Sequence, residues 1–320
     1  MDIAGDIGGT HTRLALFDPS AAGPAALEVY PSREHDGLES MIRAFLTAHP
    51  ARVERACFGI AGPVQNGHVK TTNLAWPVDA MSVARLLGIE HVGLVNDLYA
   101  NAYGIADLGP DDIDTLREGD PSMGGNAAVI SAGTGLGEAG LFWDRHRYHV
   151  FASEGGHTDF GPRDEDELAL RAYLARNHAH VSYERVCSGM GLVAIHDFLS
   201  HRDGVGGGRT EASAITKAAL DGSDPVCARA LDMMVRIYGA EAGNLALKLL
   251  ATGGIYVGGG IAPRILPKLK EGGFLEALDA KGRFAGLLSR IPVHVILNDR
   301  TALLGAARLA RGDEPGLHYG

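Results

Sequence analysis

The segment Ile3-Ala-Gly-Asp-Ile-Gly-Gly-Thr-His-Thr-Arg-Leu-Ala-Leu-Phe17 carries the strongest single indication of the fold. It predicts a buried strand over 3–7, a turn at Gly8-Gly9-Thr10 and a second strand over 13–17. Glycines in such a turn let backbone N–H groups approach phosphate oxygens, and a threonine hydroxyl adds a donor. Asp6, next to the turn, could hold Mg²⁺ directly or through water. On its own, the segment is more typical of a plain tight turn.

The same plan recurs in the middle of the chain. Residues 127–142 predict an apolar strand, a turn at Gly133-Thr134-Gly135-Leu136-Gly137 and another apolar strand. A third glycine run, Gly258-Gly259-Gly260, follows the short apolar segment 255–257 and offers a flat surface to an adenine or ribose. The two similar hairpins suggest an internal duplication. The three glycine-rich loops together favour nucleotide binding over three unrelated turns.

Short strands alternate with helices along the rest of the chain. Further strands are predicted over 56–60 and 91–95. Apolar periodicity and capping residues predict helices over 38–46, 79–88, 164–177, 210–222 and 225–251, with Asp79, Asp164 and Thr210 as N-caps and Pro225 as a helix start. This alternation predicts an α/β fold whose sheets are covered on both faces.

Composition excludes several classes of protein. The chain has 29 basic and 39 acidic residues, a net charge of −10, which argues against a nucleic-acid partner. ATP remains compatible, since bound Mg²⁺ supplies positive charge locally. Cys57, Cys187 and Cys227 form no CxxC pair, which favours buried reduced thiols over a zinc site or disulfides. With neither signal-peptide features at residues 1–6 nor a membrane-spanning segment, a cytoplasmic protein is expected.

Two common nucleotide motifs do not account for the loops. The sequence contains no GxxxxGK[ST] string, so no P-loop is predicted. A GxGxxA string occurs at Gly189–Ala194, but the preceding Tyr183-Glu-Arg-Val186 carries two charges and is a poor buried strand. A glycine-rich helix start that faces the nucleotide is the better interpretation.

Polar side chains follow predicted strands at positions where open α/β sheets bind ligands. Asn96-Asp97 follows the strand over 91–95. A kinase that phosphorylates a hydroxyl needs one carboxylate to take its proton, and we predict Asp97 for that role. A helix N-cap at Asp97 is the alternative, and the two roles can coexist. Glu154-Gly155-Gly156-His157 places a carboxylate and an imidazole on an open turn, which suits a sugar better than a metal. Glu184 has no such signal by itself.

Taken together, these residues resemble the bacterial glucokinase family, a branch of the actin-like ATPase superfamily. The matching strings, in the family's order, are Gly5–Thr10, Thr72–Trp76, Val95–Asp97, Gly133–Gly137, Gly155–Phe160, Glu184–Gly189 and Gly258–Pro263. One Gly/Thr turn is unspecific, whereas seven ordered strings are specific.

The resemblance implies a fold and an activity. The fold would be the two-lobed actin-like ATPase (ribonuclease H-like) α/β fold, with a duplicated β/α core and a central cleft. A small domain would comprise 1–108 plus 299–320, and a large domain 109–298. The activity would be ATP-dependent phosphorylation of D-glucose to glucose 6-phosphate, by a homodimer with no nucleic-acid or membrane partner.

The resemblance also assigns roles to residues. Asp97 would be the general base on the 6-hydroxyl. The substrate-binding residues would be Asn73, Asn96, Asp97, Glu154, His157 and Glu184. The nucleotide-binding residues would be Asp6, Gly8, Gly9, Thr10, Gly133, Thr134, Gly135, Gly258, Gly259 and Gly260, with Asp6 also the Mg²⁺ ligand.

Three alternatives stay open at this point. The first is a kinase of another hexose or of an N-acetylhexosamine on the same fold. The second is a sugar-responsive transcription regulator, which the net charge and the lack of a segment before Gly5 disfavour. The third is a phosphate-ester or polyphosphate hydrolase, which would not need Glu154, His157 and Glu184 to converge.

Overall fold

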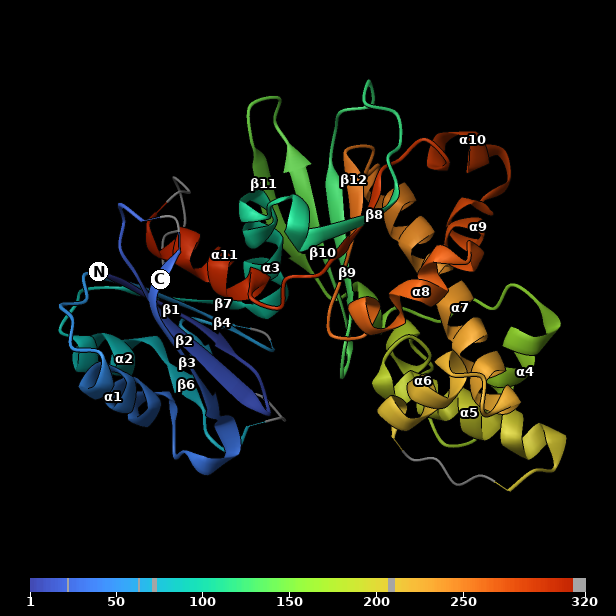
Figure 1. Cartoon of the computed structure of the whole chain (residues 1–320), viewed down its shortest axis with the longest axis horizontal. Helices are drawn as coiled ribbons and strands as arrows, with labels where there is room; N and C mark the ends of the chain where they lie inside the picture. The colour runs from blue at the N-terminus through green and yellow to red at the C-terminus, as the bar shows by residue number, and fades with distance from the viewer. Residues whose placement is uncertain (22, 63, 71–73, 207–210, 313–320) are drawn as a thin grey trace. The chain divides into compact units, whose positions relative to one another are not determined.

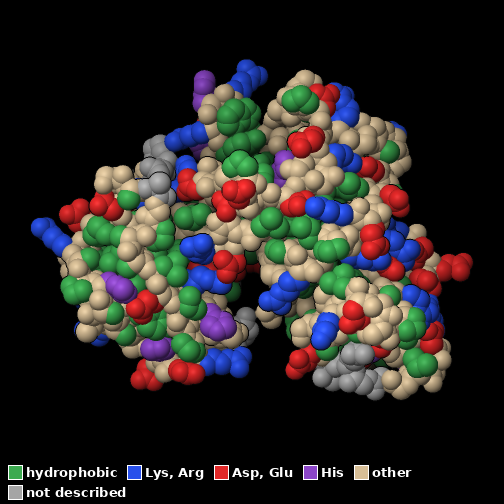
Figure 2. Space-filling model, viewed as in Figure 1, with side chains coloured by type: hydrophobic (Ala, Val, Ile, Leu, Met, Phe, Trp, Pro, Cys, Tyr) green, Lys and Arg blue, Asp and Glu red, His purple; other side chains and the backbone are tan. Residues whose placement is uncertain are grey.

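The computed structural model describes residues 1–21, 23–62, 64–70, 74–206 and 211–312. The chain divides into two compact units, which we call unit 1 (Met1–Gly109 with Asn298–Gly320) and unit 2 (Pro110–Leu297). In the described ranges, no helix is both long enough and apolar enough to cross a membrane. On the face shown in Figure 2, Lys and Arg side chains are interspersed with Asp and Glu.

Unit 1 contains a five-stranded sheet in the order β3-β2-β1-β4-β7 (Figure 1). Its strands are β1 (Asp2–Ile7), β2 (His11–Phe17), β3 (Pro24–Pro31), β4 (Arg55–Ile60) and β7 (Val92–Asn96). β1 pairs antiparallel with β2 and parallel with β4, and β4 pairs parallel with β7. A small ribbon pairs β5 (His68–Val69) with β6 (Val78–Asp79). The parallel strands β1, β4 and β7 therefore end at the same edge of the sheet.

Two layers of helices cover this sheet. They are α1 (Leu38–Ala48) and α2 (Ala80–Leu87) on one face, and α3 (Asp97–Gly104) and α11 (Thr301–Ala310) on the other. As predicted, Asp79 caps α2, accepting a hydrogen bond from Ser82 N at 2.9 Å, and Gly88 ends the helix with φ +68°. The segments predicted as α1 and α2 thus form helices with the expected ends.

Glycines bring α3 and α11 into direct backbone contact. A Cβ on Gly305 would lie 1.7 Å from the Ala100 carbonyl oxygen, and a Cβ on Gly104 would lie 1.9 Å from the Thr301 carbonyl oxygen. Only residues without a Cβ permit this approach. The helix that begins at Asp97 is therefore held by a segment from the far end of the sequence.

Unit 2 contains a six-stranded sheet in the order β11-β10-β9-β12-β13-β8. The strands are β8 (Ile113–Arg117), β9 (Ala127–Ala132), β10 (Leu136–Trp143), β11 (Tyr148–Ser153), β12 (Gly254–Gly258) and β13 (Val293–Ile296). The five neighbouring strands β11-β10-β9-β12-β13 repeat the order and the relative directions of the strands in the unit 1 sheet. In particular, β9 pairs antiparallel with β10 and parallel with β12, as β1 does with β2 and β4. The strand topology thus confirms the predicted duplication. Leu136 and Gly137, predicted to be in the turn, already belong to β10.

The helices of unit 2 are α4 (Glu165–Leu174), α5 (Gly189–Asp203), α6 (Ala212–Leu220), α7 (Pro225–Leu249), α8 (Leu266–Lys270), α9 (Gly273–Asp279) and α10 (Ala285–Leu288). Asp164 caps α4 as predicted, and Pro225 is the first residue of α7. Thr210, the predicted cap of α6, lies outside the described residues, and Glu211 stands at the N-cap of the observed helix. The glycine-rich string at Gly189 begins α5, which confirms a helix start there. Cys57, Cys187 and Cys227 are buried and form no disulfide.

Candidate active site

Unit 1 gathers its predicted site residues at the carboxyl ends of neighbouring parallel strands. Asp6 lies near the end of β1 and pairs with Gly59 of β4, and Ile60 of β4 pairs with Asn96, the last residue of β7. A Cβ on Gly59 would lie 3.7 Å from the Cα of Asp97. The sheet therefore brings the Asp6 and Asp97 positions to one edge, where the alternation of strands and helices predicts ligand binding.

Asn96, rather than Asp97, caps α3. The Asn96 Oδ1 accepts hydrogen bonds from Leu98 N at 2.9 Å and Tyr99 N at 3.3 Å, and its Nδ2 donates to the Gly62 carbonyl oxygen at 3.3 Å. The interpretation of Asp97 as the N-cap is therefore wrong. Asp97 is the first helical residue, and its Oδ1 accepts a hydrogen bond from Leu98 N at 3.0 Å. Its carboxylate is held at a helix N-terminus, where negative charge is stabilised.

The Gly8–Thr10 turn is fastened from behind by Ser32. Gly8 N donates to the His11 carbonyl oxygen at 3.0 Å, and the Ser32 Oγ donates to the Gly8 carbonyl oxygen at 2.7 Å. Ser32 N donates to the Thr10 carbonyl oxygen at 2.9 Å. Ser32 is buried, whereas Thr10 is exposed. These hydrogen bonds fix the turn on its inner side, and Thr10 lies at the surface.

Arg13 links Asp6 to Asp299. Arg13 Nη1 lies 3.2 Å from Asp6 Oδ2, and Nη2 lies 2.9 Å from Asp299 Oδ2. Burial raises the pKa of Asp6, and the Arg13 charge opposes that rise. The sequence analysis missed Arg13 and Asp299. The register of the first hairpin, which pairs Asp6 with Arg13 across β1 and β2, was the signal that could have found Arg13.

Three glycine-rich segments of unit 2 meet at the end of β9. Gly189 N donates to the Gly133 carbonyl oxygen at 2.9 Å, so the start of α5 abuts the Gly133–Gly135 turn. Gly259 has φ +83°, and a Cβ there would lie 2.2 Å from the Ala132 carbonyl oxygen. Ile261 N donates to the same oxygen at 3.2 Å. The predicted nucleotide loops at 133–135 and 258–260 are therefore one surface, not two.

Tyr238 of α7 ties both loops together from inside the core. Its hydroxyl donates to the Ile130 carbonyl oxygen at 3.1 Å, reaches the Gly258 carbonyl oxygen at 3.4 Å and accepts from Ala132 N at 3.2 Å. Burial raises its pKa well above the usual range, which keeps the hydroxyl protonated as a donor. Nothing local in the sequence indicates this contact, which spans about one hundred residues.

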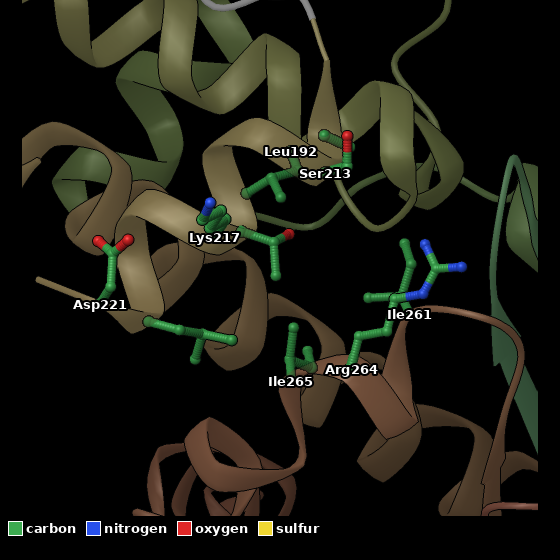
Figure 3. Close-up of a pocket in the computed structure, with 10 residues that line it drawn as sticks. Leu192, Ser213, Lys217, Asp221, Ile261, Arg264 and Ile265 are labelled. Atoms are coloured by element: carbon green, nitrogen blue, oxygen red, sulfur yellow. The ribbon is translucent and has the colours of Figure 1, made fainter. Parts of the chain in front are cut away.

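A cavity of about 480 Å³ adjoins the third glycine run (Figure 3). Its lining comes from α5, α6 and the short helix η6 (Ala262–Ile265): Leu192, Ala212, Ser213, Thr216, Lys217, Leu220, Asp221, Ile261, Arg264 and Ile265. Apolar side chains alternate with a few polar and charged ones, an arrangement typical of small-molecule pockets. The sequence analysis did not predict this pocket, because its walls are far apart in the sequence.

Glu184 and the turn that carries Glu154 and His157, the predicted sugar-binding segments of unit 2, both contact the start of β10. Glu154 precedes the 3₁₀ turn η4 (Gly155–His157) as its N-cap residue, His157 is the last residue of that turn, and both are exposed. A Cβ on Gly156 would lie 2.0 Å from the Leu136 carbonyl oxygen, so the turn rests on that strand. Glu184 Oε2 accepts a hydrogen bond from Leu136 N at 3.0 Å.

Glu184 also contacts the Gly133–Gly135 turn, which is one of the predicted phosphate-binding turns. A Cβ on Gly135 would lie 2.3 Å from Glu184 Oε2. Gly135, Glu184 and the Glu154–His157 turn are therefore neighbours, although the sequence alone gave Glu184 no signal. Asn73 lies outside the described residues.

Comparison with known proteins agrees with this arrangement. The family model for glucokinase matches residues 3–313. A glucokinase of Nostoc sp. is 44% identical, with 96% of this chain and 98% of that protein covered. The crystal structure of a glucokinase from an Antarctic psychrotroph matches with a TM-score of 0.86 at 30% identity, covering 97% of this chain and 98% of that one.

A second solved structure shares the fold at lower identity. A ROK family glucokinase from Streptomyces griseus, in complex with glucose and AMPPNP, matches with a TM-score of 0.66 at 23% identity, covering 97% of this chain and 99% of that one. The predicted fold class, the actin-like α/β fold of sugar kinases with a duplicated core, is confirmed.

Proposed function

The chain belongs to the glucokinase family and catalyses ATP-dependent phosphorylation of glucose, and we propose how its own residues divide that work. The observation that carries the proposal is the placement of Asp97, the first residue of α3, at the strand edge that also holds the Gly8–Thr10 turn. Transfer of a phosphoryl group to a hydroxyl requires a carboxylate close to the loop that binds the phosphates.

Asp97 takes the proton of the glucose 6-hydroxyl as that oxygen attacks the terminal phosphorus of ATP. The hydrogen bond from Leu98 N to Oδ1 fixes the carboxylate at the start of α3. Asn96 fixes the helix start, so its substitution would misplace the base as well as remove a sugar contact. Phosphoryl transfer depends chiefly on such positioning.

The remaining hydroxyls of the sugar are assigned to Glu154, His157, Glu184 and Asn73. The carboxylates accept hydrogen bonds from hydroxyls, and the imidazole donates or accepts. The support for this assignment is that Glu184 and the turn that carries Glu154 and His157 both contact Leu136 at the start of β10. Glu184 and the Gly135 turn touch, so a sugar held by Glu184 would be close to the phosphate-type loop.

ATP is assigned to the glycine-rich loops and the adjoining cavity. The turns at Gly8–Thr10 and Gly133–Gly135 would offer backbone N–H groups to the phosphates. The Gly258–Gly260 run leads into Ile261 and the cavity of about 480 Å³, which is large enough for the nucleoside. Its apolar walls suit an adenine ring, and the charged side chains at its edge suit a ribose or phosphate.

Mg²⁺ would bind at Asp6, directly or through water. A carboxylate oxygen is the ligand type that Mg²⁺ prefers. Arg13 engages Oδ2 of Asp6, so Oδ1 is the oxygen suited to the ion. When bound, the ion neutralises phosphate charge. We further propose a cytoplasmic homodimer.

The experiment is turnover of ATP to ADP by Asp97→Asn with saturating glucose. We expect kcat to fall by about 10²–10⁴-fold, with a smaller change in the KM for glucose, because proton transfer is lost while binding contacts remain. Asp36→Asn is the control, since it removes an exposed carboxylate from the same unit. Wild-type turnover by Asp97→Asn would exclude Asp97 as the base.

A panel of acceptors tests the substrate. Glucose, mannose, fructose, N-acetylglucosamine and N-acetylmannosamine are each supplied with ATP and Mg²⁺. We expect the highest kcat/KM for glucose. A higher kcat/KM for an N-acetyl sugar would leave the assignments of the base and the nucleotide loops in place but would overturn glucose as the substrate.

A further inference from the structure

Two carboxyl groups are buried in the core of unit 2, and one of them, that of Glu138, lies directly behind the Glu154–His157 turn. Glu138 of β10 is 1% exposed and Glu241 of α7 is 0% exposed. Burial and the charge of Glu241 raise the pKa of Glu138. Carboxyl groups in such surroundings cannot both be ionised without a large cost in free energy.

The donors around the pair are distributed unequally. Glu241 accepts from Asn244 Nδ2 at 2.7 Å and pairs with Lys248 Nζ at 3.2 Å. Within the described part of the chain, Glu138 Oε1 is buried and has no hydrogen-bond partner. A proton carried by Glu138 and donated to Glu241 would supply the missing hydrogen bond. The geometry therefore assigns the negative charge to Glu241 and the proton to Glu138.

The other titratable groups around the pair support that assignment. Lys281 Nζ donates to Asn244 Oδ1 at 2.5 Å, which adds positive charge on the Glu241 side. Cys187, Tyr183 and Tyr238 also face the pair, and burial raises the pKa of each, so they stay neutral. Burial and the charge of Glu241 raise the pKa of Glu138 to about 8, and Lys248 opposes the shift.

Glu138 is in direct contact with the turn that carries the sugar-binding residues. A Cβ on Gly155 would lie 1.8 Å from Glu138 Oε2. Gly155 N also donates to Ser153 Oγ at 3.0 Å, which anchors the turn on the same strand pair. A change of charge at Glu138 therefore acts on the backbone of Gly155 with no intervening side chain.

We propose that Glu138 is a positioning residue which, protonated and hydrogen-bonded to Glu241, supports the Gly155–Gly156 turn and so sets the positions of Glu154 and His157 for the sugar. This inference rests on the proposed function of that turn. Loss of the proton puts a second negative charge in this part of the core, directly beneath Gly155, and the turn moves. Glucose binding weakens as a result, while the nucleotide loops, which within the described residues share no hydrogen bond with Gly155 and are held by the Tyr238 hydroxyl, are less affected.

The first test is the pH profile of kcat/KM for glucose in the full-length protein. In the wild type we expect about a tenfold fall between pH 7 and pH 9, expressed mainly as a higher KM for glucose, because the neutral form of Glu138 is lost around pH 8. The side chain in Glu138→Gln keeps the shape of a protonated glutamate and keeps a hydrogen-bond donor. This variant should therefore retain kcat/KM near pH 7 to within about threefold and should not show the fall in kcat/KM at alkaline pH. Glu165→Gln, an exposed substitution in α4, should keep the wild-type profile.

The second test does not depend on activity. Infrared difference spectroscopy should detect a protonated carboxyl band in the wild type that disappears on titration through pH 8 and is missing in Glu138→Gln. An alkaline fall that persists in Glu138→Gln, or a wild type without the titrating carboxyl band, would overturn the inference. If the protein shows the titrating carboxyl band but does not phosphorylate glucose, the proposed sugar-binding function of the turn is overturned. The assignment of the proton to Glu138 would stand in that case.

Discussion

The contact between α3 and α11 leads to a quantitative prediction for Gly305→Ala. The new Cβ would lie 1.7 Å from the Ala100 carbonyl oxygen and 2.7 Å from Gly104 N. Atoms of these types stay more than about 3 Å apart, so the helices must separate by about 1 Å or more. An overlap of this size belongs at the upper end of the ~1–3 kcal/mol that overpacking costs. Alanine recovers about 1 kcal/mol through its higher helix propensity. The expected net loss of stability is about 2 kcal/mol.

The two tryptophans allow this loss to be measured in unit 1 alone. Trp76 is buried in unit 1, and Trp143 lies in unit 2. In a Trp143→Phe background, Trp76 fluorescence follows the unfolding of unit 1 in urea. With an m value of about 2 kcal/mol/M, Gly305→Ala should lower the midpoint by about 1 M.

The matched control is Gly286→Ala in α10, where a Cβ would meet nothing within 4 Å. It should leave the Trp76 midpoint unchanged. If Gly305→Ala also leaves that midpoint unchanged, the close packing of α3 on α11 is refuted. Gly305→Ala should also lower turnover, because α3 begins at Asp97 and a displaced α3 displaces that carboxylate.

Three further predictions concern the site. The neutral form of Glu138 persists in the fold up to about pH 8 while the unfolded chain ionises near pH 4.5, so wild-type stability should fall between these values. Glu138→Gln should remove that slope and be the more stable protein at pH 8, as measured by urea unfolding across pH. Thr216→Phe should fill part of the cavity and raise the KM for ATP by about tenfold, with the KM for glucose unchanged in the same assay. Asp6→Asn should raise the Mg²⁺ concentration needed for half-maximal turnover, which a Mg²⁺ titration measures; an unchanged Mg²⁺ requirement would remove Asp6 from the metal site.

The sequence predicted the parts of the fold that depend on local signals. Asp79, Gly88, Asp164 and Pro225 mark helix ends through contacts a few residues away, and all four were assigned correctly. β3 was missed because it is an edge strand with a proline at each end and no clean alternation. β8 and β13 were missed because they are short and paired with distant segments.

The same division applies to the site. Asp6 lies near the end of a strand, and Asp97 and the glycine loops come at or directly after strand ends, so their neighbourhood can be predicted from strand order. Glu184 was found only through family resemblance, because its partner Leu136 N lies on a distant strand. Ser32 and Tyr238 act through their contacts with distant backbone atoms. The residues next to Ser32 and Tyr238 in the sequence form no pattern that predicts these contacts.

The pairing of α3 with α11 also has a consequence for biosynthesis. Unit 2 is one continuous segment, whereas unit 1 needs a helix that follows it in the sequence. Nearly 200 residues separate Gly104 from Thr301, and at about 5–20 residues per second the ribosome takes about 10–40 s to make them. During that interval α3 lacks the surface against which it packs. Unit 2 can therefore fold first, and the nascent chain acquires a correctly placed Asp97 only after translation has passed α11.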